Sequence, residues 1–198
     1  MWPFENKKKE KEKAERSNDI CLQEPKTEFE KEIMINKLKD VLNQTSKEII
    51  FLCIGSDRST GDSLGPMVGT MLKDKFFPYP VYGTLHTPVH ALNITRVLKD
   101  IQDSFEDPFI FGIDACLGDE RNIGFIYLSE GSFIPGKALN KRLPSVGDYH
   151  MKAIVNYLDP ISPVQSLNNT RMYTVLKMAE IMTGIIMSGA SAACEIHK

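Results

Sequence analysis

Short apolar segments alternate with longer amphipathic ones along the first two thirds of this chain. Residues 49–54 and 109–113 are apolar almost throughout and too short to be buried helices, so each is predicted to be a buried strand. A shorter strand is predicted over residues 81–85. Helical spacing of apolar residues follows residue 63 and recurs over residues 89–105. Strands that alternate with helices are typical of a parallel, doubly wound α/β sheet.

The last third of the chain departs from this alternation. A fourth strand is predicted over residues 123–128, and no helix-length segment separates it from the third. We therefore expect these two strands to pair antiparallel. A long loop rich in glycine, proline and basic residues, 131–147, leads to a fifth strand at residues 151–157. The final helix is expected from residue 167 or 170 to about residue 187.

The N-terminal part is predicted to lie outside this domain. Residues 7–16 carry mixed charges and almost no apolar groups, so we expect residues 1–25 to form a disordered, charged tail. The expected role of this tail is a tether or solubility segment, with a removable pro-segment as the alternative. A helix is predicted over residues 26–45, with a capping box at its start. Residues 46–198 are then expected to form a single α/β domain.

Composition narrows the choice of function mainly by exclusion. The 198 residues carry a formal net charge of -2, which gives no electrostatic reason to expect nucleic-acid binding. The four cysteines form no C-x-x-C pair, which favours a reducing cytosol over a disulfide framework or a zinc site. We find no secretory signal and no run of the roughly 18 apolar residues that a membrane span needs. We therefore expect a cytoplasmic protein that does not bind a membrane.

The strongest candidate chemistry follows the first buried strand. There a glycine-containing turn carries Asp57 and Asp62, and Pro66 falls in the first turn of the next helix. Ligands of open α/β sheets bind beyond the carboxyl ends of the strands, which is where Asp62 lies. Asp114 follows the third strand in the same way. If these strands are neighbours, both carboxylates point into one crevice.

Two carboxyl groups in one crevice suit hydrolysis, because one can hold a proton while the other stays ionised. Each aspartate also has a structural interpretation, as a helix N-cap for Asp62 and as a turn residue for Asp114. A phosphate site at the helix N-terminus is a further alternative. The chain has no glycine-rich phosphate motif, however, and the acids of this loop would oppose a phosphate.

Other residues of suitable chemistry stand nearby in the sequence. Cys116 is a candidate nucleophile, although an ordinary buried cysteine is the simpler interpretation. The candidates for acid–base or metal chemistry are His86, His90 and His150. His150 is the most interesting of the three, because it leads directly into the fifth predicted strand.

Several segments together resemble the YyaC-type sporulation protein family, whose members are often called spore proteases. These segments are CIGSDRSTGDSLGP, VYGTLHTPVHALN, IDACLG, LPSVGDYHMKAIVN and the element NTRM before a methionine-rich helix. That family is similar to the germination protease of endospore-forming bacteria and, more distantly, to the hydrogenase maturation endopeptidases. The resemblance spans roughly residues 49–189 and implies a three-layer phosphorylase/hydrolase-like fold, with a mostly parallel mixed sheet flanked by helices.

The resemblance also implies roles for particular residues. In the germination protease, one catalytic aspartate lies in a loop that Asp62 matches, and a second lies in a context that Asp114 matches. The hydrogenase endopeptidases bind a metal through two acids and a histidine, and we assign the histidine to His150. A divalent metal is thus an alternative to a metal-free aspartate pair, which we favour. The residues expected to bind substrate are Gly55, Ser56, Asp57, Arg58, Thr60 and Gly61.

The expected function is therefore peptide-bond hydrolysis in a sporulating or germinating bacterium, in the cytoplasm of its forespore or mother cell. The substrate would be an extended protein or peptide segment, bound across the strand ends or along a sheet edge. A non-catalytic sporulation protein that binds a peptide or partner on the same fold is the alternative. A homo-oligomer is left open by the sequence.

Overall fold

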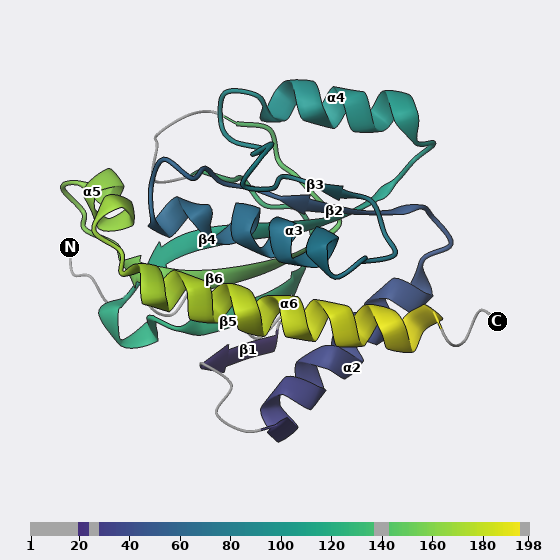
Figure 1. The fold of residues 1–198 in the computed structure, drawn as a ribbon, viewed down its shortest axis with the longest axis horizontal. Helices are drawn as coiled ribbons and strands as arrows, with labels where there is room; N and C mark the ends of the chain where they lie inside the picture. The colour runs from purple at the N-terminus through teal and green to yellow at the C-terminus, as the bar shows by residue number, and fades with distance from the viewer. Residues whose placement is uncertain (1–19, 24–27, 137–142, 195–198) are drawn as a thin grey trace, which may run out of the picture.

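The computed structural model describes residues 20–23, 28–136 and 143–194. Six strands form one sheet in the order β1-β5-β6-β4-β2-β3 (Figure 1). The strands are β1 (Ile20–Gln23), β2 (Ile49–Cys53), β3 (Val81–Tyr82), β4 (Phe109–Gly118), β5 (Phe125–Glu130) and β6 (Tyr149–Tyr157). β3, β2, β4 and β6 pair in parallel, while β5 and β1 pair antiparallel. The predicted α/β class, with a mostly parallel mixed sheet flanked by helices, is confirmed.

Helices cover both faces of this sheet. They are α2 (Glu28–Gln44), α3 (Leu64–Asp74), α4 (Ile94–Ser104), α5 (Pro163–Asn168) and α6 (Met172–Cys194), with short 3-10 helices η1 (Gly61–Ser63) and η2 (Glu120–Asn122). One core joins α2, α3 and α6 to one face of the sheet, and α4 covers the other face (Figure 1). Alternate residues of β2 enter each core, which explains why its sequence is apolar throughout.

The order of the last strands differs from the prediction. β5 was expected beside β4, but β6 lies between them and pairs with both. The connection through η2 carries the chain past this position, and the long loop after β5 returns β6 into it. β6 hydrogen-bonds β4 along nearly its whole length, so β4 continues to Gly118 rather than ending at Ile113.

The N-terminal segment also differs from the prediction. The expected tail through residue 25 is wrong for residues 20–23, which form β1 against the outer edge of β5. This pairing satisfies backbone groups that an edge strand would otherwise leave open. Residues 1–19 and 24–27 lie outside the described residues. α2, expected as a separate element before the domain, contributes Met34, Leu38, Val41 and Leu42 to the same core as α6.

α6 is the only helix within the described residues whose length and composition would allow it to cross a membrane. Half of the most apolar 18-residue stretch of α6 is buried inside the structure. Its inward face packs against α2, α3 and the sheet through residues that include Val175, Met178, Ala179, Met182 and Ile186. The apolar character of α6 is therefore explained by its place in the core.

Two glycines of α3 bring this helix unusually close to the sheet. A Cβ atom at Gly65 would lie 2.1 Å from the carbonyl oxygen of Ile54, and one at Gly69 would lie 1.9 Å from that of Gly83. Any side chain at these positions would force the helix away from the strand ends. This contact holds the start of α3, and with it Asp62 in η1, against the end of β2.

We expect Gly69→Ala to lower the free energy of unfolding by about 1–3 kcal/mol, because the added methyl group has no space. The matched control is Gly184→Ala on α6, where a Cβ would meet nothing within 4 Å. That substitution should raise stability by up to about 1 kcal/mol through helix propensity. Urea denaturation followed by circular dichroism measures both. Equal effects of the two substitutions would show that α3 does not pack as described.

Candidate functional site

Asp114 owes its position to the unequal lengths of β2 and β4. The last residue pair between these strands is Cys53 with Ile113, and β4 continues beyond it. Asp114 is thus the first residue of β4 that has no β2 neighbour, on the side where the loop after β2 folds over the strand ends. Only 6% of Asp114 is exposed. The prediction that Asp114 follows its strand was wrong, because it lies inside β4. It does lie beyond the end of the neighbouring strand β2.

Asp62 reaches the same place through a tight turn. Gly55 has φ +145°, and a Cβ there would lie 2.0 Å from the carbonyl oxygen of Asp62. Only glycine allows this approach. The backbone N–H of Ser56 donates to that carbonyl oxygen at 3.0 Å and closes the turn. Asp62 is not the N-cap of α3, because it lies inside η1. The N-cap of α3 is Ser63, whose side chain makes no cap hydrogen bond.

Asp62 and Asp114 line one cavity of about 240 Å³. Its remaining lining is mostly apolar and includes Ala115, Cys116, Leu117, Ile134, Leu158, Pro163 and Leu167. The structure thus brings together the two acids that the sequence singled out. Apolar walls around paired carboxyl groups favour uptake of protons, because burial penalises the charged form.

Burial gives the two carboxyl groups different proton affinities. Burial raises the pKa of Asp62 to about 6, against the opposing effects of the Ser56 N–H and of His90. Burial raises the pKa of Asp114 further, to about 8. Lys152 acts to lower this pKa and the nearby Asp62 to raise it. At neutral pH Asp62 is therefore ionised while Asp114 holds a proton.

Lys152 belongs to the site and was missed in the sequence. It is the direct neighbour of Asp114 across the β4–β6 pair, and it lines the cavity. Its Nζ also lies 4.0 Å from the centre of the Phe133 ring. The signal in the sequence was Lys152 itself, a charged residue in a predicted strand. Charged residues are rare inside a sheet, so its presence there would have indicated a functional position. That signal could not be read without knowing that β6 lies inside the sheet.

His90, one of three histidines considered from the sequence, is the one close enough to Asp62 to affect the pKa of its carboxyl group. Its Nδ1 accepts a hydrogen bond from the Leu92 N–H at 3.2 Å, which leaves the proton of the neutral ring on Nε2. The Asn93 side chain holds this turn, with its Oδ1 accepting from the His90 N–H at 2.8 Å. His86 lies in an exposed part of the same connection.

His150 does not line the cavity. It pairs with Gly112, two residues before Asp114, and its Nδ1 lies 2.8 Å from the Gly131 carbonyl oxygen. Its ring packs against Phe133 with centroids 4.9 Å apart. His150 thus anchors the start of the loop after β5. Within the described residues no three His, Cys, Asp or Glu side chains are placed to bind a metal. The expected set of two aspartates and His150 therefore does not fit a metal, and we derive no step through one.

The six residues expected to bind substrate do not line the cavity either. Gly55 and Gly61 are buried, and a Cβ at Gly61 would lie 2.8 Å from the Thr170 hydroxyl. Both glycines serve the packing of the turn. Asp57 and Arg58 are exposed, and Ser56 and Thr60 are half-buried. Their part in substrate binding stays a prediction.

The raised pKa of Asp114 predicts a pH-dependent stability. The unfolded carboxyl group loses its proton near pH 4, whereas the folded one keeps it to about pH 8. The folded state thus binds more protons over this interval, and its free energy of unfolding should fall as pH rises. Asp114→Asn should flatten this slope and be at least as stable as the wild type at pH 7. The exposed Asp103→Asn is the control in urea titrations, and a wild-type slope in Asp114→Asn would contradict the burial of this group.

Comparisons with known proteins identify relatives but no activity. The chain is 43% identical over 137 residues to the uncharacterized protein YyaC of Bacillus subtilis (strain 168). The matched region covers 69% of this chain and 66% of YyaC. The chain thus spans just under two thirds of its relative. This match confirms the resemblance to YyaC.

A solved structure, the NiFe hydrogenase maturation protease HycI from Thermococcus kodakarensis KOD1, is 15% identical with a TM-score of 0.45. The matched region covers 76% of this chain and 98% of the HycI chain. Similarity at that level carries no information about activity. The model of a family described as protein of unknown function (DUF1256) matches residues 23–185, and this chain therefore belongs to the DUF1256 family.

Proposed function

We propose that this protein is a peptidase that uses Asp62 and Asp114 as a metal-free acid–base pair. One observation carries the proposal: two carboxyl groups of unequal pKa line the same largely apolar cavity. Unequal proton affinities assign the roles, with Asp62 as the base and Asp114 as the acid. The edges of a parallel sheet beyond the strand ends are also where ligands of such folds bind.

The reaction can be written with these two groups and one water. Asp62 takes a proton from water as its oxygen attacks the peptide carbonyl carbon, while Asp114 gives its proton to the carbonyl oxygen. The resulting diol collapses when Asp62 returns its proton to the amide nitrogen and the C–N bond breaks. Asp114 recovers its proton from the hydroxyl group as the new carboxyl group forms. Both acids end in their starting states.

Lys152 is proposed to set the proton affinity of Asp114. Without a positive charge beside it, a carboxyl group this buried would release its proton reluctantly. The ammonium group of Lys152 lowers the pKa of Asp114 and so eases release of the proton. The Phe133 ring holds this ammonium group in place. Lys152 is therefore a positioning residue that acts through Asp114.

The proposed setting is the cytoplasm of a spore-forming bacterium, in the forespore or mother cell. This setting and a spore protein as substrate rest on the sequence motifs that resemble the sporulation family. The second candidate function is a non-catalytic protein that binds a peptide on the same fold. The deep burial of Asp114 favours this candidate, because a sealed acid would not reach a substrate carbonyl.

Cleavage should be lost in either Asp62→Asn or Asp114→Asn, since each removes a proton-transfer group without changing side-chain size. The measurement is mass spectrometry of new peptide termini after incubation with purified spore proteins, with and without EDTA. A loss of about 100-fold or more is expected for each variant, with Asp103→Asn as control. Retained cleavage in either variant, or cleavage that EDTA abolishes, would refute the metal-free pair. Complete absence of cleavage by the wild type would favour the binding protein.

The rate of cleavage should follow a bell-shaped pH profile. It rises as Asp62 loses its proton near pH 6 and falls as Asp114 loses its own near pH 8, so the maximum should lie near pH 7. Lys152→Met should move the alkaline limb to higher pH, because it removes the charge that lowers the pKa of Asp114. If the alkaline limb of Lys152→Met lies at the same pH as that of the wild type, Asp114 is not the acid.

A further inference from the structure

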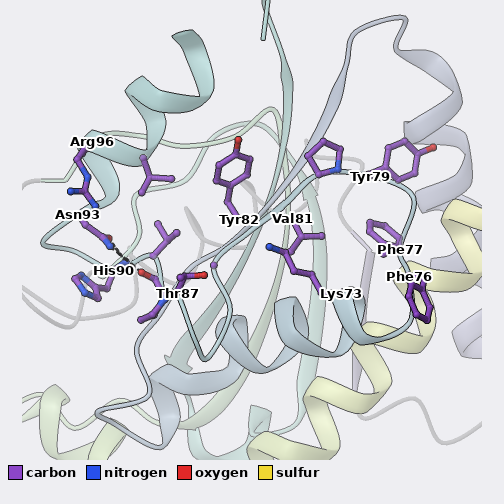
Figure 2. A pocket seen from close by; sticks show the side chains of 15 residues that line it. Lys73, Phe76, Phe77, Tyr79, Val81, Tyr82, Thr87, His90, Asn93 and Arg96 are labelled. Carbon is purple, nitrogen blue, oxygen red and sulfur yellow. Dashed lines mark hydrogen bonds between the residues drawn. The ribbon is translucent and has the colours of Figure 1, made fainter. Parts of the chain in front are cut away.

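A second and larger hollow lies along the free edge of the sheet. It has a volume of about 840 Å³, and the edge strand β3 forms its floor (Figure 2). The end of α3 and the segment after it form one wall, and the start of α4 with the turn before it forms the other. These walls belong to opposite layers of the fold. The hollow, here called the β3 groove, is therefore open to an extended chain lying beside β3.

The backbone of β3 offers hydrogen bonds to such a chain. The Phe51 N–H donates to the Pro80 carbonyl oxygen at 2.9 Å, and Phe51 pairs with Val81. In this parallel arrangement the N–H and C=O of Val81 point away from β2. No strand of the described sheet lies on that side. An added strand could bond to this residue, as in other cases of peptide binding at a sheet edge.

The charges in the groove are of one sign. Lys73 lies on the α3 wall and Arg96 on the α4 wall, while no aspartate or glutamate lines the groove. Neither side chain makes an ion pair within the described part of the chain. Side chains of an extended peptide alternate between the two faces of a sheet. Two neighbouring acidic residues would therefore place one carboxylate against each wall.

Phe76 lines the groove at its outer end, in a backbone conformation that residues with a side chain rarely adopt. It has φ +55°, and 93% of it is exposed. It occupies the left-handed position that ends α3: its N–H donates to the Lys73 carbonyl oxygen, and the Phe77 N–H donates to that of Leu72. Glycine is the usual residue at this position. The exposed ring at this position is available for contact with a ligand in the groove.

The other end of the groove lies near Asp62. His90 lines the groove there, and it is close enough to Asp62 to affect the pKa of that carboxyl group. The Gly55 N–H donates to the Val89 carbonyl oxygen at 2.8 Å, which joins this wall to the turn that carries Asp62. A peptide lying along β3 would thus continue toward the carboxyl groups.

We propose that the β3 groove binds an extended segment of a protein substrate as an added strand, and that this segment carries two neighbouring acidic residues between apolar or aromatic ones. The proposal deepens the peptidase function and rests on it for the fate of the bound segment. Single-stranded nucleic acid also combines negative charge with planar groups. It is disfavoured because it would leave the Val81 backbone groups without strand partners.

The test measures binding rather than cleavage. The probe is a fluorescein-labelled peptide, Ser-Val-Tyr-Glu-Glu-Val-Thr-Ser, added to the full chain carrying Asp62→Asn and followed by anisotropy. Lys73→Gln and Arg96→Gln should each weaken binding about three-fold, and together about ten-fold. The matched controls are Lys75→Gln, at the C-cap of α3, and Lys99→Gln, on α4. Both side chains are exposed and lie outside the groove, so neither substitution should change binding.

Strand addition is tested with the backbone of the probe. Two versions are N-methylated at alternate residues, one at odd and one at even positions. One version should lose binding by about ten-fold or more, because it lacks the N–H groups that face β3, and the other should keep it. Equal affinity of both versions, or equal binding of a peptide with Lys-Lys in place of Glu-Glu, would overturn the proposal.

A further variant cannot fail through loss of the fold. Phe76→Gly relieves the left-handed strain, so its Tm should not fall, while binding of the probe should weaken. Tighter binding of a ten-residue oligothymidylate than of the peptide would overturn the proposal in favour of nucleic acid. If the Lys73 and Arg96 substitutions leave the cleavage of spore proteins unchanged, the proposed role of the β3 groove is overturned and the peptidase function is not. Probe binding by a wild type that cleaves nothing would support the groove and overturn the peptidase.

Discussion

The offset between β2 and β4 is the constraint on which the candidate site depends. β2 ends at Cys53 while β4 continues, so the first position of β4 without a β2 partner faces the turn that follows β2. The glycine contacts of α3 then hold Asp62 over this position. A longer β2 would cover Asp114, and a bulkier α3 would lift Asp62 away. The geometry of the acid pair therefore comes from strand lengths and backbone contacts, with little help from hydrogen bonds between side chains.

This arrangement works against the stability of the domain. Two carboxyl groups are placed where burial raises their pKa, and the burial of Asp114 costs free energy whenever the unfolded chain would ionise it. The two apolar cores must offset this cost. A structural role would be served better by an amide or an apolar side chain. Retention of buried acids beside a cavity is what a functional site is expected to show.

The two faces of the sheet differ in what they can do. The larger core lies on the face covered by α2, α3 and α6, and it reaches the cavity of the acids through Leu167. On the other face, the smaller core under α4 shares the sheet with Asp114, Lys152 and His150. The loop after β5 adds Phe133 to this face, against Gly112, where a Cβ would lie 2.4 Å from the ring. Asp114 and its charged neighbour Lys152 therefore lie on the face that α4 covers.

The sequence by itself determined the elements that depend on local pattern. Apolar runs gave the central strands, helical spacing gave α3 and α6, and position after a strand singled out Asp62 and Asp114. Only the tertiary structure decided what depends on register and strand order. It placed β6 beside β4, which brings Lys152 to Asp114. It also put His90 close enough to Asp62 to affect the pKa of that carboxyl group. It also paired residues 20–23 with β5. These outcomes follow from long-range pairing of backbone groups, which carries no local signature in the chain.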